Sequence, residues 1–160
     1  MSITIIYGSD GGCTRKIASK IASKINAKTL DIKKAQTADF ENCSLLILGC
    51  PTYADGDLQT DWIDHYEKLE EANLQGKKVA IFGMGDQMNY PESFVDAIGI
   101  LYDTVSEKGA QVVGFTENTG YDFSKSQGLR EGRFAGLALD EDNQSGKTEA
   151  RINAWLAQIK

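Results

Sequence analysis

The sequence has little that would support metal or thiol chemistry. It contains three cysteines and a single histidine among 160 residues. Cys13, Cys43 and Cys50 show no C-x-x-C spacing and leave an odd one over, so they indicate neither a disulfide framework nor a zinc site. We therefore expect reduced thiols and no bound metal. His65 is far along the chain from any carboxylate that could complete a catalytic triad, and we expect it to be a surface residue.

Long apolar runs are also missing. No stretch approaches the ~20 apolar residues that a membrane-spanning helix needs, and no basic segment precedes an apolar one at the amino terminus. We expect a cytoplasmic protein. The formal net charge of −6 repels nucleic acid and anionic membrane surfaces, so we expect neither of these as a partner.

The hydrophobic pattern predicts one α/β domain. A chain of 160 residues with 41% hydrophobic content suits a single layered core. Short runs rich in β-branched residues alternate with stretches of helical period, which is typical of βαβ units and a parallel sheet covered on both faces. The predicted strands are 3–7, 28–32, 44–49, 78–83 and 111–115. The predicted helices are 17–25, 58–69, 94–105 and 152–159.

One segment interrupts this alternation. Residues 116 to about 133 are polar and contain glycine, and they exceed the ~2–6 residues of an ordinary connection. We interpret this segment as an insertion. The apolar stretch 134–139 that follows could continue the place of the fifth strand in the sheet.

The loop after the first predicted strand suits a phosphate group. Residues 8–14 read Gly-Ser-Asp-Gly-Gly-Cys-Thr and open directly into a helix. Backbone N–H groups and the positive end of the helix favour an anion there, and the hydroxyls of Ser9 and Thr14 can donate further hydrogen bonds. The absence of a lysine after the second glycine argues against a nucleotide P-loop, and the glycine spacing is not G-x-G-x-x-G. A tight strand-to-helix turn explains the glycines about as well.

The loops after the third and fourth predicted strands each carry a tyrosine. Tyr53 lies within 50–58 and Tyr90 within 83–91. Ligands of open α/β sheets bind beyond the carboxyl ends of the strands, so both loops are well placed to contact one. Two tyrosines there could sandwich a flat ring system, although ordinary packing explains each one singly. Together the three loops predict a site for a planar heterocycle with a phosphate tail.

Several segments resemble the flavodoxin family, and the resemblance covers almost the whole chain. They are GCPTY-x-x-G-x-LQ-x-DW at 49–62, GKKVAIFG-x-GDQ at 76–87, GYDF at 120–123 and LALDEDNQ at 137–144. The last two lie in or after the insertion that distinguishes the long-chain members. The resemblance implies one flavodoxin-like domain over 1–160. Its fold would be a three-layer α/β sandwich with a five-stranded parallel sheet in the order 2-1-3-4-5, helices on both faces, and an insertion in or after strand five.

The resemblance also implies non-covalently bound FMN and a low-potential one-electron carrier, not an enzyme with a substrate of its own. Family behaviour implies cycling between the neutral semiquinone and the anionic hydroquinone, and no residue is expected to be catalytic. The residues that would bind FMN are Ser9, Asp10, Gly11, Gly12, Cys13, Thr14, Pro51, Thr52, Tyr53, Ala54, Asp55, Gly56, Gly85, Asp86, Tyr90 and Asp142.

The resemblance assigns a part of FMN to most of these residues. Loop 9–14 would hold the phosphate without lysine or arginine. Tyr90 would stack on the outer face of the isoalloxazine, and Tyr53 on the inner face, where many relatives have tryptophan. Thr52 would help to hold the ribityl chain or the phosphate.

The remaining assignments concern the edges of the ring. Asp86 and neighbouring amides would meet the pyrimidine edge, and Asp142 resembles a ribityl hydroxyl contact. The backbone at 54–56 would face flavin N5, where a carbonyl of the Ala54-Asp55 peptide could accept a hydrogen bond from the reduced N5–H. Asp55 itself, if it faces the flavin, should lower the reduction potential.

Gly11 departs from the family pattern, because relatives usually have serine or threonine there. The missing hydroxyl should cost roughly 1 kcal/mol of phosphate binding, so FMN binding should survive.

Acidic residues are concentrated between Asp55 and Glu71, with only Lys68 opposing them. This run begins at the predicted flavin edge. We expect it to dock basic redox proteins such as a flavodoxin reductase and acceptor oxidoreductases, although a solvated helix face also explains such a run. We expect a monomer. The acidic residues are Asp55, Asp57, Asp61, Asp64, Glu67, Glu70 and Glu71.

Three alternatives belong to other functional classes. A phosphotransfer receiver domain would need an aspartate at the end of strand three, where the chain has Gly49-Cys50-Pro51. An FMN-dependent quinone or azo reductase could use the same fold, but stacked tyrosines would block its substrate face. A flavodoxin-like protein that has lost its flavin is hinted at only by Gly11.

Overall fold

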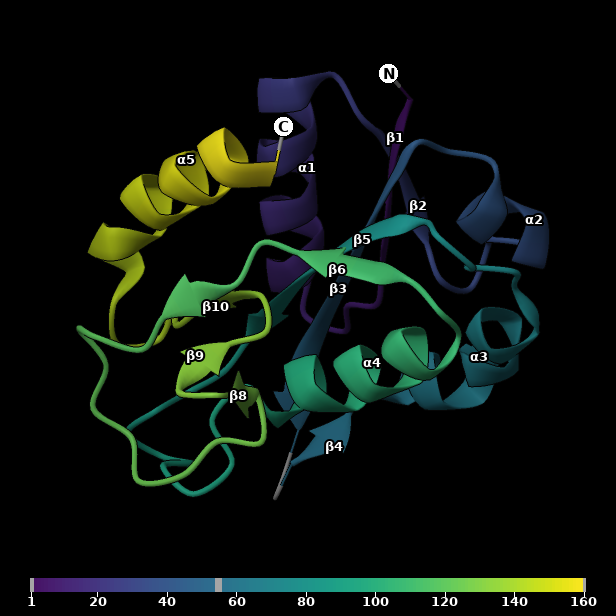
Figure 1. The fold of residues 1–160 in the computed structure, drawn as a ribbon. Helices are drawn as coiled ribbons and strands as arrows, with labels where there is room; N and C mark the ends of the chain where they lie inside the picture. Colours follow the sequence, from purple (N-terminus) through teal and green to yellow (C-terminus); the bar gives the residue numbers. More distant parts are fainter. Residues whose placement is uncertain (1, 54–55, 160) are drawn as a thin grey trace.

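A parallel sheet forms the centre of the protein, as a computed structural model of residues 2–53 and 56–159 describes it (Figure 1). Its main strands follow the order β10-β5-β3-β1-β2, and all neighbouring pairs along this path are parallel. This arrangement confirms the predicted order 2-1-3-4-5. The first four predicted strands correspond to β1 (Ile3–Tyr7), β2 (Lys28–Asp31), β3 (Leu45–Tyr53) and β5 (Lys78–Met84).

Two short strands share the fifth position of the sheet. β6 (Gln111–Val113) pairs with the beginning of β5, and β10 (Leu137–Leu139) pairs with its end. The predicted strand 111–115 stops early because Gly114 has a φ of +88° and turns the chain away. The apolar stretch after the insertion therefore does continue the fifth strand, as its pattern indicated.

Helices cover both faces of this sheet, which confirms the three-layer fold. Figure 1 shows α1 (Cys13–Ile25) and α5 (Thr148–Ile159) on one side, with α3 (Thr60–Glu71) and α4 (Asp96–Glu107) on the other. The short helix α2 (Thr37–Glu41) packs with α3. Successive side chains of a strand point to opposite faces, so neighbouring Ile5 and Ile6 enter the two different cores.

The helix after the third strand begins later than predicted. Leu58 belongs to β4 (Asp57–Leu58), which pairs antiparallel with the end of β3. The side chain of Gln59 then accepts a hydrogen bond from the Trp62 N–H and caps α3. A local apolar pattern cannot distinguish a short strand from a first helical turn, so only the pairing with β3 decides this boundary.

The insertion folds into a small antiparallel sheet in the order β7-β9-β8 (Thr116–Glu117, Arg133–Phe134 and Leu129–Arg130). Aromatic rings hold it against the start of α4. Phe94 stacks on Phe123 with centroids 5.3 Å apart, and Tyr121 meets the edge of Phe134 at 5.1 Å. The GYDF motif therefore supplies core aromatics of the insertion. A short 3-10 turn (Ser145–Lys147) then leads into α5.

Within the described residues, no helix has both the length and the apolar character to cross a membrane.

Candidate functional site

The loops after β1, β3 and β5 line one hollow at the carboxyl edge of the sheet. Its volume is about 620 Å³. The segment after β10 closes one side of it. The lining residues are Ser9, Asp10, Gly11, Cys13, Thr14, Pro51, Thr52, Tyr53, Met84, Gly85, Asp86, Tyr90, Ser93, Glu141 and Asp142.

Most of the predicted site residues meet in this hollow. Among those that the structure describes, only Gly12 and Gly56 do not line it. Ala54 and Asp55 lie outside the described residues, so their predicted part near N5 stays a prediction.

Three lining residues escaped the sequence analysis, namely Met84, Ser93 and Glu141. Glu141 precedes the predicted Asp142, and that adjacency was a usable signal. Met84 ends β5 and Ser93 lies just before α4, and nothing in their local sequence distinguishes them from packing residues.

The glycine-rich loop presents the amino terminus of α1 to the hollow. Gly12 has a φ of +87°, a left-handed conformation that glycine adopts without strain. Its N–H donates a 3.0 Å hydrogen bond to Ser9 Oγ, and its carbonyl accepts from the Lys16 N–H. The N–H groups of the first helical turn have no carbonyl one turn earlier, so they are suited to an anion. Thr14, which is buried, adds its hydroxyl to the same lining.

A buried glutamine holds this loop against α3. Gln59 has no exposed surface, and its Nε2 donates to the carboxylates of Asp10 at 2.8 Å and Asp61 at 2.9 Å. A Cβ atom on Gly8 would lie 2.1 Å from Gln59 Oε1, so the loop can approach this closely only with glycine there. Gly8 and Gln59 therefore fix where the phosphate-suited loop lies.

The two predicted tyrosines come from different loops and differ in exposure. Tyr90 is 48% exposed, and its N–H donates to the Asp86 carbonyl at 2.9 Å, which closes a tight turn. Tyr53 ends β3 and is half-buried. Burial and the neighbouring Asp10 carboxylate both raise the pKa of the Tyr53 hydroxyl, which therefore remains neutral. Both rings line the hollow.

Gly56 lies against a buried carboxylate. Gly56 has a φ of +109°, and a Cβ atom there would lie 2.6 Å from Asp96 Oδ2. Asp96 is buried, and its Oδ1 accepts the Gln127 N–H at 2.7 Å. Burial raises the pKa of the Asp96 carboxyl. Both the positive φ and the lack of space for a Cβ atom explain the glycine at this position.

The side chain of Thr52 makes one hydrogen bond within the protein. Its Oγ1 accepts the Ala97 N–H at 2.9 Å, near the start of α4. The hydroxyl keeps its own hydrogen, which can still be donated into the hollow.

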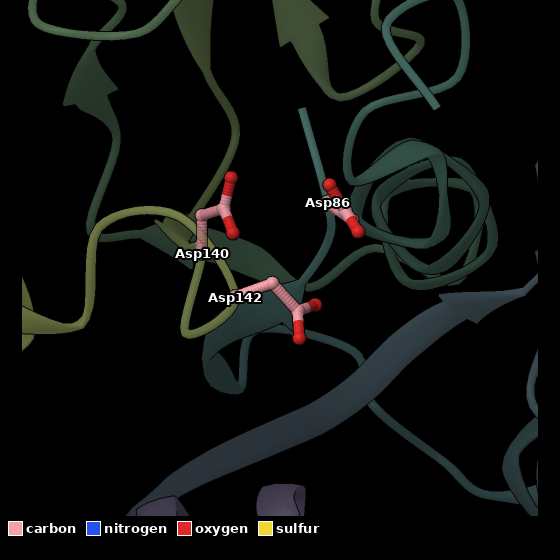
Figure 2. A group of neighbouring side chains, drawn as sticks. All are labelled: Asp86, Asp140 and Asp142. Atoms are coloured by element: carbon pink, nitrogen blue, oxygen red, sulfur yellow. The ribbon is translucent and has the colours of Figure 1, made fainter. Parts of the chain in front are cut away.

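Three aspartates form an acidic rim of the hollow, where the segments after β5 and β10 meet. Figure 2 shows Asp86, which follows β5, facing Asp140 and Asp142, which follow β10. Each can place a carboxylate oxygen within 4.8 Å of the others. The fully buried Asp140 accepts hydrogen bonds from the backbone and side-chain amides of Gln87 and Asn143. This network joins two loops of the site, and N–H donors already engage the carboxylates of Asp86 and Asp140.

The surroundings shift the pKa values of half-buried Asp86 and exposed Asp142 in opposite directions. Burial opposes ionisation of Asp86, but hydrogen bonds from Asn89 and Asn143 outweigh it and lower its pKa. Burial, followed by the charges of Asp86, Asp140 and Glu141, raises the pKa of Asp142. The rim is therefore a region of negative potential.

The thiols are protonated and do not suit nucleophilic chemistry. Cys13 is the exposed first residue of α1, and partial desolvation and the Glu141 and Asp142 carboxylates raise the pKa of its thiol. Cys50 is fully buried, and burial raises the pKa of its thiol to about 12.

The acidic run is not a uniformly free surface. Asp61 is bound by Gln59 and lies 4.0 Å from Lys33 Nζ, whereas Asp64 and Glu67 are exposed. His65 is half-buried, at a kink in α3 with φ −118° and ψ 15°, so it lies at the surface with part of its side chain covered. The helix turns part of this residue toward the protein, a detail that charge pattern alone cannot reveal.

The sequence of residues 5–155 matches the model of a protein family described as Flavodoxin. The chain belongs to the flavodoxin family. It is 44% identical to the flavodoxin of Synechocystis sp., over 99% of this chain and 95% of that one. It is 41% identical to the flavodoxin of Klebsiella pneumoniae, over 99% and 97%. These matches confirm the resemblance predicted from the motifs.

A solved structure extends the similarity to three dimensions. The flavodoxin of Fusobacterium nucleatum, bound to flavin mononucleotide, superimposes with a TM-score of 0.91 at 38% sequence identity, covering 98% of this chain and 95% of that one. The flavodoxin fold predicted from the sequence is thereby confirmed, and the family favours the carrier prediction over the quinone or azo reductase.

Proposed function

We propose that this protein is a one-electron carrier that binds FMN in the hollow at the carboxyl edge of the sheet. One observation carries the proposal: the amino terminus of α1 and the rings of Tyr53 and Tyr90 line the same hollow. That combination suits a planar ring with a phosphate tail. The similar Fusobacterium nucleatum flavodoxin was solved with flavin mononucleotide bound.

The chemistry of the lining fits the phosphate of FMN. Among the described residues that line the hollow, none is lysine or arginine. The N–H groups at the start of α1 and the hydroxyls of Ser9 and Thr14 would therefore stabilise the phosphate by hydrogen bonds. Gly11 leaves room for a side chain with a further hydrogen-bond donor, because a Cβ atom there would meet nothing within 4 Å.

The rest of the lining suits the ring and the ribityl chain. Tyr90 and Tyr53 would cover the two faces of the isoalloxazine and exclude water from them. The Thr52 hydroxyl and the Asp142 carboxylate would face the ribityl hydroxyls, and Asp86 with its neighbouring amides would meet the pyrimidine edge. Ser9, Asp10, Gly11, Cys13 and Thr14 would surround the phosphate.

When bound, FMN would supply the one-electron chemistry, and the residues around it would set how readily it accepts charge. Asp10, Asp86, Glu141 and Asp142 all line the hollow. Their carboxylates repel added negative charge, and this repulsion would make the reduced carrier a strong reductant. An Asp55 side chain turned toward the ring would add to this effect.

A stepwise anaerobic reduction followed by absorption spectroscopy tests the proposal. We expect the purified protein to be yellow and to take up electrons in two separate one-electron steps. A colourless protein that does not bind added FMN would refute the cofactor assignment. A single two-electron step would refute the carrier assignment and favour a reductase.

We further propose that basic redox proteins, a flavodoxin reductase and acceptor oxidoreductases, dock beside the hollow. Exposed acidic residues of α3, such as Asp64 and Glu67, support this. Ile63 is 56% exposed on the same helix, and Met88 is 59% exposed beside Tyr90, so apolar contacts are available near the charges. We also propose that the carrier acts as a monomer in the cytoplasm, which light scattering and cell fractionation would test.

A further inference from the structure

A second hollow lies between α5 and the insertion. Its volume is about 430 Å³, and residues of β7, β9, β10 and α5 line it. Among the residues that the structure describes, none lines both this hollow and the proposed FMN site. Its size lies within the range of sites for small ligands, ~300–1,000 Å³. It is therefore a separate candidate site.

Two arginines from distant parts of the chain line this hollow. The Cζ atom of Arg133 lies 5.0 Å from the ring centroid of Phe115, and that of Arg151 lies 4.0 Å from the ring of Tyr121. Stacking on a ring restricts a guanidinium group and leaves the N–H groups at its edge available to an acceptor. Both arginines are thus partly ordered before any ligand arrives.

Neither guanidinium forms a salt bridge within the part of the chain that the structure describes. Over residues 2–53 and 56–159, no carboxylate pairs with Arg133 or Arg151, whereas Arg130 contacts Asp103 at 2.8 Å. Arg151 Nη2 donates to the Gly120 carbonyl at 3.2 Å. Its Nη1 is buried without an acceptor in the described part of the chain. A buried, unpaired N–H of a charged group is costly, so an anion that supplies the acceptor would be stabilised.

The remaining lining combines aromatic, aliphatic and polar side chains. Trp155 is buried, and its Nε1 already donates to the Gly114 carbonyl at 2.9 Å. The Tyr121 hydroxyl likewise donates to the Ala138 carbonyl at 2.7 Å. The Trp155 ring is almost fully covered, whereas Phe115 and Tyr121 are half-buried and offer ring surface to a ligand. Glu117 also lines the hollow, so two positive charges face one negative charge, which favours a ligand with a single negative charge.

We propose that this hollow binds a small aromatic carboxylate. The carboxylate accepts hydrogen bonds from Arg133 and Arg151, and the ring lies on the aromatic lining. A guanidinium group matches a carboxylate in planar geometry, and its charge-assisted hydrogen bonds are stronger than neutral ones. The site gives the insertion and α5 a joint binding function that is independent of FMN.

Nuclear magnetic resonance of the FMN-loaded, ¹⁵N-labelled full chain tests this proposal. Three probes are titrated: benzoate, the neutral and isosteric benzamide, and inorganic phosphate. We expect benzoate to give saturable shifts of the backbone amides of Thr119, Tyr121 and Arg151. Benzamide lacks the charge and phosphate lacks the ring, so both should bind at least about tenfold more weakly.

Variants assign the binding to the arginines. Arg133→Gln removes an exposed guanidinium and should weaken benzoate binding at least about fivefold. Lys34→Gln removes one positive charge from the surface after β2 and should leave benzoate binding unchanged. Arg151→Gln also loses the bond to Gly120, so Arg133→Gln is the deciding variant, and its amide spectrum reports directly whether the fold is kept.

Four results would overturn the proposal. They are no saturable shift with benzoate up to about 10 mM, equal affinity for benzamide or phosphate, shifts confined to other parts of the protein, and unchanged affinity in Arg133→Gln.

Discussion

The side-chain amide of Gln59 donates a 2.8 Å hydrogen bond to the Asp10 carboxylate, which links the start of α3 to the loop before α1. The two residues are 49 positions apart in the sequence. Gln59 also accepts the Trp62 N–H, so one buried side chain caps a helix and positions the proposed phosphate loop. Both the stability of the fold and the binding of the cofactor should therefore depend on Gln59.

Replacing Gln59 with leucine tests that dependence. The substitution leaves the Trp62 N–H without its acceptor and the Asp10 carboxylate without its donor, so it should cost about 1–3 kcal/mol of unfolding free energy. FMN affinity should fall as well, because the loop is less firmly held. Urea unfolding and fluorescence titration with FMN measure the two effects. Gln111→Leu, on the exposed start of β6, is the control and should change neither by a comparable amount.

Gly11→Ser should strengthen FMN binding. Nothing lies within 4 Å of a Cβ atom at this position, so the new hydroxyl fits and can donate to the phosphate. One added hydrogen bond of this kind contributes about 1 kcal/mol, or roughly a fivefold gain in affinity. Gly146→Ser has the same open surroundings in the turn before α5 and should leave affinity unchanged. Weaker FMN binding in Gly11→Ser would show that the phosphate does not approach this residue.

Tyr90→Leu should weaken FMN binding by the value of a stacking interaction, about 0.5–1.5 kcal/mol. Tyr90 is nearly half exposed and lines the hollow, so its loss should disturb the fold little. Tyr90→Phe keeps the ring and should bind FMN nearly as the parent does. If both variants bind equally well, Tyr90 does not stack on the flavin.

Asp142→Asn should stabilise the apoprotein at neutral pH. The folded-state pKa of Asp142 is raised, so this carboxyl favours the folded state only when protonated, and its contribution is lost as pH rises through that pKa. The melting temperature of the variant should therefore exceed that of the parent at pH 7. The difference should disappear below the ordinary pKa of 3.8. Asp64→Asn removes the same charge from the exposed face of α3 and separates this local effect from that of net charge.

Charge reversal on α3 tests the proposed docking surface. Asp64→Lys with Glu67→Lys should slow electron transfer from a basic reductase at low salt, and the difference should shrink as salt rises. Asp61 is a poor choice for this purpose because it is bound by Gln59. Glu107→Lys with Glu117→Lys changes the net charge equally at exposed sites on other elements. Equal rates in the two double variants would mean that α3 is only a solvated surface.

The sequence alone determined the layered fold and most of the site. The strand and helix periods predicted which faces are buried, and the glycine-rich turn at 8–14 predicted an anion site because its composition supplies free N–H groups locally. The tyrosines at 53 and 90 were identifiable because they lie in turn-forming segments after strands. These are properties of short segments, which a sequence displays directly.

The tertiary structure decided which distant groups meet. The fifth position of the sheet is filled by two separate strands, β6 and β10, and only their pairing with β5 shows this. The bond between Gln59 and Asp10, the acidic rim completed by Asp140, and the hollow that Arg133 and Arg151 share also depend on packing between remote segments. A linear pattern of polarity does not specify these contacts, because they depend on how the helices and loops pack on the sheet.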